Sequence, residues 1–194
     1  MKNMMLLAAL ILVTGCATTT GLDKNAKLDN PSKEAIIVFG IKPETFHINI
    51  MKGKVVNGKF EHSAFVTPTA WVAPSKGYVV LKVPVLQNDE TYSIIRVGEG
   101  LLNKVFQCDW PAVTFSPKAG KINYIADISY SRIDDKIHLK GKISSNSNEA
   151  KKFTNTNYPN LNSDFVNTGY KFRTVTNTNC VAGYKTFNPI EYVK

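Results

Sequence analysis

Apolar and polar residues alternate in short runs over most of the chain after residue 34. Because successive side chains of a β-strand point to opposite faces, each run predicts a strand with one buried face. In the run from Phe46 to Ile50, the three apolar side chains are expected to face inward, with His47 and Asn49 facing outward. The pattern recurs with turn residues between the runs, which predicts a mainly β chain.

Two runs carry more information than simple alternation. Ala35 to Ile41 is almost continuously apolar, as expected for a strand that is covered on both faces. Tyr78 to Val85 has Val or Leu at every second position, and Pro84 marks it as an edge strand or a strand end because proline cannot donate to a ladder. Asn57-Gly58 predicts a hairpin turn. Further strands are expected at 60–66, 92–97, 112–115 and 170–175.

The most regular pattern lies at 121–143 and predicts an antiparallel hairpin with one solvent-exposed face. In its first strand, alternate residues from Ile122 to Tyr130 are expected to share one face, with Asp127 on the other. In its second strand, the apolar side chains are expected to point inward. The side chains on the outer face are basic: Lys136, His138, Lys140 and Lys142.

Helical signals are confined to the C-terminal part of the chain. Ser147 is placed to cap a short helix that runs through Phe153, and Pro159 to open a second that reaches Val166. Many short strands, few helices and no repeated unit predict an antiparallel β-sandwich or barrel with one or two short C-terminal helices.

The first residues follow a different pattern, that of a secretory signal peptide. Lys2 precedes an apolar run, Met4 to Val13, that is too short for a stable membrane span. The alternatives are an ordinary cleaved signal and a buried helix, but a core helix should show a polar face and this run has none. Its end, Val13-Thr14-Gly15-Cys16, resembles the lipobox of bacterial lipoproteins. The resemblance implies cleavage before Cys16 and acylation of that cysteine.

This resemblance divides the chain into three parts. Residues 1–15 are the signal peptide, 16–33 are small and polar enough for a flexible tether, and 34–194 are long enough for a single domain. Ala17 follows the cysteine in place of the Asp that retains lipoproteins at the inner membrane of enteric bacteria, which favours the outer membrane. The lipid anchor would then be the membrane contact of the protein.

Two cysteines remain if Cys16 carries lipid. In an oxidising compartment, an even remainder indicates a disulfide between Cys108 and Cys180. Such a bridge would stabilise the fold by about 4 kcal/mol in the chain-entropy model, because it closes a long loop. The alternative is a pair of buried free thiols. The wide spacing of the two cysteines excludes a close-spaced zinc or redox motif.

The segment from Phe115 to Ile125 (FSPKAGKINYI) resembles a strand, a Pro/Gly turn and an aromatic strand of small, uncharacterised bacterial lipoproteins of DUF2846-like type. The resemblance covers this hairpin and the lipobox. It implies a sandwich related to transthyretin (prealbumin), and an Ig-like sandwich is the alternative from the strand pattern. It implies no reaction and no cofactor.

The formal net charge of +9 suits anionic partners. Export argues against nucleic acid, and no nucleic-acid-binding motif is present. The basic row Lys136, His138, Lys140 and Lys142 would place charges about 7 Å apart along one strand, where they could meet phosphates or uronates of an envelope polymer. The alternative is a solvated edge strand that lysines protect from aggregation. Another envelope protein is a further candidate partner.

Catalytic signatures are weak. His47, His62 and His138 belong to no nucleophile or metal motif. Asp127, Asp134 and Asp135 are close enough in sequence for a cation site, but acidic turn residues commonly make local hydrogen bonds. Trp71 and Trp110 would suit either an aromatic platform or the core. The sequence therefore predicts a binding or structural module without a cofactor, with an envelope hydrolase assembled only in three dimensions as the alternative.

Overall fold

The computed structural model describes residues 21–62, 70–86, 90–99, 102–105, 109–133, 139–177 and 190–193. Over these residues the chain is mainly β, with a single helix, α1 (Ser147–Asn157). Its strands form two sheets. The strand bounds are β1 Glu34–Lys42, β2 His47–Val56, β3 Lys59–His62, β4 Ala70–Val72, β5 Tyr78–Pro84, β6 Thr91–Glu99, β7 Leu102–Val105, β8 Pro111–Phe115, β9 Ile122–Arg132, β10 Leu139–Ser144, β11 Phe165–Asn167, β12 Lys171–Asn177 and β13 Glu191–Val193.

The first sheet has the strand order β13-β10-β9-β1-β5. β1 lies between β5, which is antiparallel to it, and β9, which is parallel. Since β1 occupies one edge of β9, both β10 and β11 pair with its opposite edge, β10 at 127–132 and β11 at 122–124. The outer edge of β9 is therefore shared by two strands, one after the other.

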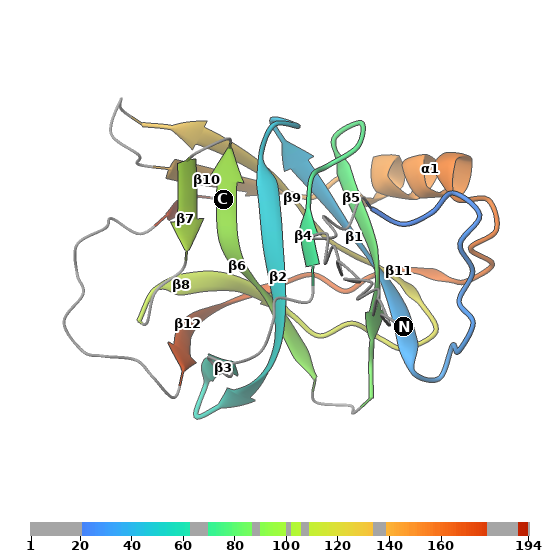
Figure 1. Cartoon of the computed structure of the whole chain (residues 1–194), viewed down its shortest axis with the longest axis horizontal. Coiled ribbons are helices and arrows are strands. Elements are labelled where there is room, and N and C mark those ends of the chain that lie inside the picture. Colours follow the sequence, from blue (N-terminus) through green and yellow to red (C-terminus); the bar gives the residue numbers. More distant parts are fainter. Residues whose placement is uncertain are drawn as a thin grey trace, which may run out of the picture.

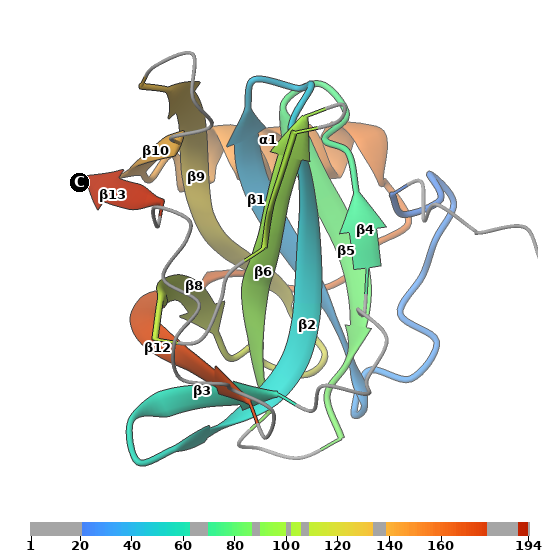
Figure 2. The same cartoon turned by 60° about the vertical axis from the view of Figure 1, so that its left-hand side comes forward.

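The second sheet closes on itself. β2 pairs with β6 and β3, β3 with β12, β12 with β8, and β8 with β6, so that five strands form a ring of pairings. β4 and β7 extend this ring at the outer edges of β2 and β6. Figure 2 shows how β2 makes this possible: it runs along β6 and then curves away into the hairpin with β3.

The main core lies between the two sheets. Phe39 of β1 and Phe115 of β8 meet edge to face with ring centroids 5.1 Å apart, and Tyr92 of β6 stacks on Phe115 at 5.9 Å. The Tyr92 hydroxyl donates a hydrogen bond to the carbonyl of Pro84 in β5, which joins the sheets directly. Each fully buried side chain of this size contributes roughly 1.5–3 kcal/mol by leaving water.

A second, smaller core covers the other face of the first sheet. Figures 1 and 2 show α1 on the side of β1 away from β2 and β6. There Ala150 of the helix packs with Ile36 and Val38 of β1, while Ile37 and Phe39 face the main core. β1 is thus buried on both faces, which confirms the prediction from its continuous apolar run.

Part of the segment predicted as a tether lies against the first sheet. Leu22 and Leu28 pack on the helix-side core, and the Leu22 amide donates to the Val80 carbonyl at 3.1 Å. The Lys82 ammonium lies 2.7 Å from the Asp29 carboxylate, a contact that lowers the pKa of Asp29. Residues 22–29 therefore form contacts with the folded domain.

Several local predictions are confirmed. Asn57 and Gly58, with φ of 50° and 78°, form the turn between β2 and β3, where two consecutive positive values match a type I′ hairpin. Among the described strands β5 pairs only with β1, and it ends at Pro84, as expected for an edge strand or a strand end with a proline. The antiparallel hairpin of 121–143 is present as β9 and β10.

Other predictions are wrong for identifiable reasons. The sheets are mixed rather than antiparallel, because β1–β9, β9–β11, β10–β13 and β3–β12 are parallel pairs, and alternation does not encode strand direction. Asn49 is buried rather than exposed. The alternate residues of β9 that were predicted to share one face lie on two faces: Tyr124 faces the helix side, and Ala126 faces the main core. The cause is a register irregularity opposite Val38 and Phe39, which shifts the alternation by one residue.

The prediction of one or two short C-terminal helices is confirmed, but the details of this region differ from the prediction. One helix is present, and its N-cap is Asn146 rather than Ser147, with the Asn146 side chain accepting from the Glu149 amide. The second helix predicted from Pro159 to Val166 is absent, and its last residues belong to β11 instead. β11 pairs with the part of the outer edge of β9 that β10 leaves unpaired, and sequence alone does not reveal this edge.

Candidate anion-binding site

Two cavities adjoin the segment that leads into β12. Both are lined by Gly169, Tyr170, Lys171 and Arg173. The smaller has a volume of about 180 Å³ and the larger about 620 Å³. Because they share one wall, we treat them as two halves of one candidate site.

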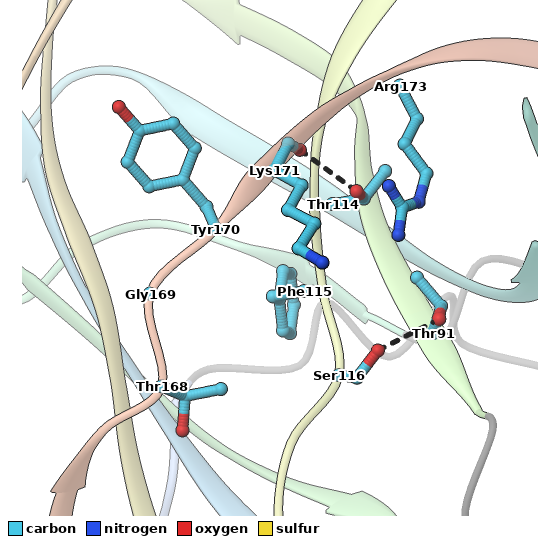
Figure 3. Close-up of a pocket in the computed structure, with 9 residues that line it drawn as sticks. All are labelled: Thr91, Thr114, Phe115, Ser116, Thr168, Gly169, Tyr170, Lys171 and Arg173. Atoms are coloured by element: carbon cyan, nitrogen blue, oxygen red, sulfur yellow. Dashed lines mark hydrogen bonds between the residues drawn. The ribbon is translucent and has the colours of Figure 1, made fainter. Parts of the chain in front are cut away.

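The smaller cavity combines two cations with several hydroxyl groups. Lys171 and Arg173 lie two residues apart in β12, so their side chains leave the strand on one side, and Figure 3 shows both head groups directed toward the cavity, with Tyr170 on the opposite side. Hydroxyl-bearing residues complete the polar lining: Thr91, Thr114, Ser116 and Thr168.

The hydroxyl groups are held in place by hydrogen bonds. Thr114 of β8 donates to the Lys171 carbonyl at 2.9 Å, which fixes β12 against β8. Thr91 and Ser116 share a hydrogen bond of 2.9 Å across the base of the cavity. The cavity wall is therefore supported by three separate strands and the turn that follows β8.

The two cations are not neutralised within the described part of the chain. Neither Lys171 nor Arg173 forms a salt bridge with a described residue, and no acidic residue is among the described ones that line the cavity. The nearby carboxylate of Glu90 is already engaged by Lys52 at 2.7 Å and by the Leu86 amide at 2.9 Å.

Arg173 is half-buried, and its Nε is fully buried without a hydrogen-bond partner among the described residues. A buried donor without an acceptor costs roughly 1–3 kcal/mol, and more when it is charged. A bound acid group would offset this cost through charge-assisted hydrogen bonds to the guanidinium. The smaller cavity therefore has the chemistry of an anion site.

The larger cavity lies where the outer edge of β9 changes partner. It is lined by the last residue of β10, Ser144, by the last residue of β11, Asn167, and by Ile125 between the two paired stretches of β9. Ser145 and Phe172 complete the lining. The cavity thus follows from the topology, because two short strands share one edge and leave a gap.

Asn123 holds the turn that follows Ser116 of the smaller cavity. Its side chain is fully buried in β9, where Oδ1 accepts from the Lys118 amide at 2.8 Å. Its Nδ2 donates to the Ile36, Lys118 and Lys121 carbonyls at 3.2, 3.0 and 3.0 Å. These bonds tie the Pro117–Gly120 turn, which follows Ser116 of the site, to the central strands.

Half of the predicted basic row can be placed. Lys140 and Lys142 project from the face of β10 opposite the main core, as predicted, whereas Lys136 and His138 lie outside the described residues. β10 is not an edge strand here, because β13 pairs with Lys140 to Lys142. By alternation, Ser144 shares the face of Lys142, so this face of β10 leads to the larger cavity.

The histidines and tryptophans do not converge on the site. His47 stacks on Trp71 at 5.6 Å, and the Arg96 guanidinium lies 5.1 Å from the Trp71 ring, all on the outer face of β2, β4 and β6. Trp110 packs against the main core instead. His62 neighbours Phe60 at 6.2 Å. A joint platform of the two tryptophans is thus not formed.

Asp127 occupies an unusual position on the helix side of β9. Its Oδ1 is buried without a hydrogen-bond partner among described atoms, and burial raises the pKa of this carboxyl. The hydroxyl of Tyr124 nearby accepts from the Asn146 amide at 2.8 Å, and burial raises its pKa to about 12. The predicted partners Asp134 and Asp135 lie outside the described residues, as do Cys16, Cys108 and Cys180.

Sequence reasoning did not single out Lys171 and Arg173. The signal was present in Tyr170-Lys171-Phe172-Arg173, where aromatic and basic residues alternate and so place both cations on one face of a strand. The hydroxyl groups of β6 and β8 gave no comparable signal, because only the fold brings them to β12.

Within the described ranges, no three His, Cys, Asp or Glu side chains come together as a metal site. Those ranges contain no helix with the length and hydrophobicity of a membrane span. No protein-family model, curated protein or solved structure matches this chain.

Proposed function

We propose that this chain is a bacterial envelope lipoprotein whose β domain binds anionic groups of an envelope polymer, without catalysing a reaction. In this proposal Cys16 carries the lipid, the outer membrane is the site of anchoring, and Cys108 and Cys180 form a disulfide. The domain would be a sandwich of transthyretin-like or Ig-like type, of which the two packed sheets are the supporting observation.

The observation that carries the binding proposal is the pair Lys171 and Arg173, which face one cavity with no acidic counterpart among the described residues. The hydroxyl pair of Thr91 and Ser116 beside them could donate one hydrogen bond to a phosphate or carboxylate, whereas the hydroxyls of Thr114 and Thr168 already donate to the Lys171 carbonyl and to Asn123. The net charge of +9 would attract polyanions over longer range, and Lys140 and Lys142 would extend the basic surface along β10.

Binding of inorganic phosphate, followed by NMR chemical shifts, tests the anion site. The variant Lys171→Gln/Arg173→Gln is expected to lose binding by at least about tenfold, the equivalent of 1.4 kcal/mol. Lys151→Gln/Lys152→Gln is the matched control, because it removes the same charge from exposed positions of α1. Equal loss in both variants, or binding in neither the wild type nor the control, would contradict a built anion site.

Intact-mass analysis of the membrane-extracted protein tests the anchor. The expected mass is that of residues 16–194 plus acyl chains, and the Cys16→Ser variant should carry no acyl chain and leave the membrane fraction. Reduction should add the mass of two hydrogens if Cys108 and Cys180 are bridged. An unacylated wild-type chain would contradict the lipoprotein proposal without affecting the anion test.

A further inference from the structure

The larger cavity differs in chemistry from the cationic pocket that it adjoins. Away from the shared segment it is lined by hydroxyl and amide side chains and one apolar residue: Ser144, Ser145, Asn167 and Ile125. Its volume of about 620 Å³ falls within the range of small-molecule sites. No acidic residue is among its described lining residues.

An aromatic group forms the apolar side of this cavity. Phe172 packs edge to face with Tyr170 at 5.4 Å and contacts Tyr192 of β13 at 5.1 Å. Although it belongs to this cluster, Phe172 keeps 38% of its surface exposed. The cluster holds the Phe172 ring in place, so its exposed surface is a fixed apolar wall beside the serine and asparagine side chains.

Such a wall suits a sugar ring. A pyranose has C–H groups on one face, which pack on an aromatic ring, and hydroxyl groups around its rim, which need hydrogen-bond partners such as Ser144, Ser145 and Asn167. A bare inorganic anion would use only the cationic half of the site, and a neutral sugar only the aromatic half.

Gly169 connects the two halves. It lines both cavities, and no atom lies within 4 Å of the position that a Cβ would take there. Its φ of 69° is one that glycine adopts without strain. Open space beside Gly169 therefore adjoins both cavities, and an acid substituent of a ring in the larger cavity would reach the cations along this residue.

We propose that the site takes an acidic saccharide unit. Its sugar ring lies against Phe172 in the larger cavity, and its acid group, a phosphate or a uronate carboxylate, lies between Lys171 and Arg173. This inference rests on the proposed anion-binding function and specifies the ligand of the same site.

Four probes test the proposal by NMR titration: glucose 6-phosphate, glucuronate, inorganic phosphate and glucose. At least one of the two acidic sugars should bind the wild type about tenfold more tightly than both inorganic phosphate and glucose. The stronger of the two identifies phosphate or carboxylate as the acid group. Phe172→Ala should remove this advantage and leave the affinity for inorganic phosphate unchanged.

Val56→Ala is the control for Phe172→Ala, because Val56 is exposed to a similar extent, 37%, and lies on the β2–β3 hairpin. It should retain the preference for the acidic sugar. If the acidic sugars bind no more tightly than inorganic phosphate, the saccharide inference is wrong and the anion site stands. If glucose binds as tightly as the acidic sugars, the pairing of ring and acid is wrong. Absence of binding for all four probes would contradict both proposals.

Discussion

The hydroxyl of Thr168 donates a hydrogen bond of 2.7 Å to Oδ1 of the buried Asn123. Thr168 lines the cationic cavity, and Asn123 holds the Pro117–Gly120 turn and the β1–β9 pair through its other bonds. The segment that leads to Lys171 and Arg173 is thus tied to β9 by the Asn123 side chain, in addition to the backbone hydrogen bonds from the Thr168 and Gly169 amides to the Tyr124 carbonyl.

Replacing Asn123 by Ala is therefore expected to lower the free energy of unfolding by roughly 2–4 kcal/mol, because several buried groups lose their partner at once. Urea denaturation measures this loss. Asn162→Ala, at an exposed position, should change stability by less than about 0.5 kcal/mol. A small effect at Asn123 would mean that water replaces its side chain and that the turn is not held as described.

Arg173 should contribute to binding rather than to stability. In phosphate-free buffer, Arg173→Met is expected to leave the free energy of unfolding unchanged or to raise it by up to about 1 kcal/mol, because the variant removes a half-buried charge that lacks a described partner. Added phosphate should raise the melting temperature of the wild type and not of the variant. A loss of more than about 1 kcal/mol without phosphate would show that the guanidinium makes stabilising contacts.

Asp127 gives a prediction for the pH dependence of stability. Burial raises the pKa of its carboxyl, so the folded chain binds this proton more tightly than the unfolded chain does. Its contribution to the free energy of unfolding therefore falls as pH rises from the ordinary pKa of 3.8 through the raised one. Asp127→Asn lacks this fall and should gain stability relative to the wild type between about pH 4 and pH 7.

Asp164 is the natural control for Asp127, because its pKa is shifted in the opposite direction. Lys121 lies 2.5 Å from the Asp164 carboxylate and lowers its pKa. Asp164→Asn should therefore lose stability relative to the wild type as pH rises from the lowered pKa to somewhat above the ordinary 3.8, and this deficit should stay nearly constant at higher pH. Urea denaturation of the wild type, Asp127→Asn and Asp164→Asn from below pH 3.8 to about pH 7 gives the comparison. If the stability difference from the wild type changes with pH in the same direction for both variants, the assignment at Asp127 is wrong.

Gly141 allows β13 to lie against β10. A Cβ at this position would come within 2.6 Å of the Tyr192 ring, which is too close without a shift, and would lie 3.5 Å from the Tyr130 ring, an ordinary van der Waals distance. Gly141→Ala is expected to cost about 1–3 kcal/mol and to expose the amides of β10 that pair with β13. Hydrogen exchange at Lys140 and Lys142 measures the effect. Ser144→Ala, at an exposed position of the same strand, should leave exchange there unchanged.

The strands were predictable where one face of the strand is more buried than the other, because apolar residues then recur at every second position along it. Val79 and Leu81 of β5 share the main core as alternation indicated. The prediction failed where both faces are apolar, because Ile125 lies at the irregularity of β9 and fits either register. It also failed for strand direction, since the partner of β12, Phe60 to His62, lies more than one hundred residues earlier in the chain.

The candidate site was predictable only in part, for a related reason. The alternation of Lys171 and Arg173 is local and could be recognised, whereas Thr91 and Thr114 become neighbours of these cations only through the pairing of β6, β8 and β12. The basic row on β10 was recognised correctly at Lys140 and Lys142, but the sequence does not reveal that β13 covers the edge of that strand.

The double burial of β1 also constrains how the chain reaches its fold. Its apolar residues, Ile36 to Phe39, gain their neighbours β5 and β9 only after residue 84 and residue 122 have been added to the chain. Until then, an uncharged segment of high β-propensity remains without a partner, and such segments associate with one another. Chains truncated before β9 should therefore aggregate through β1, and a cell that makes this protein has to keep that segment apart from other copies until synthesis has passed β9.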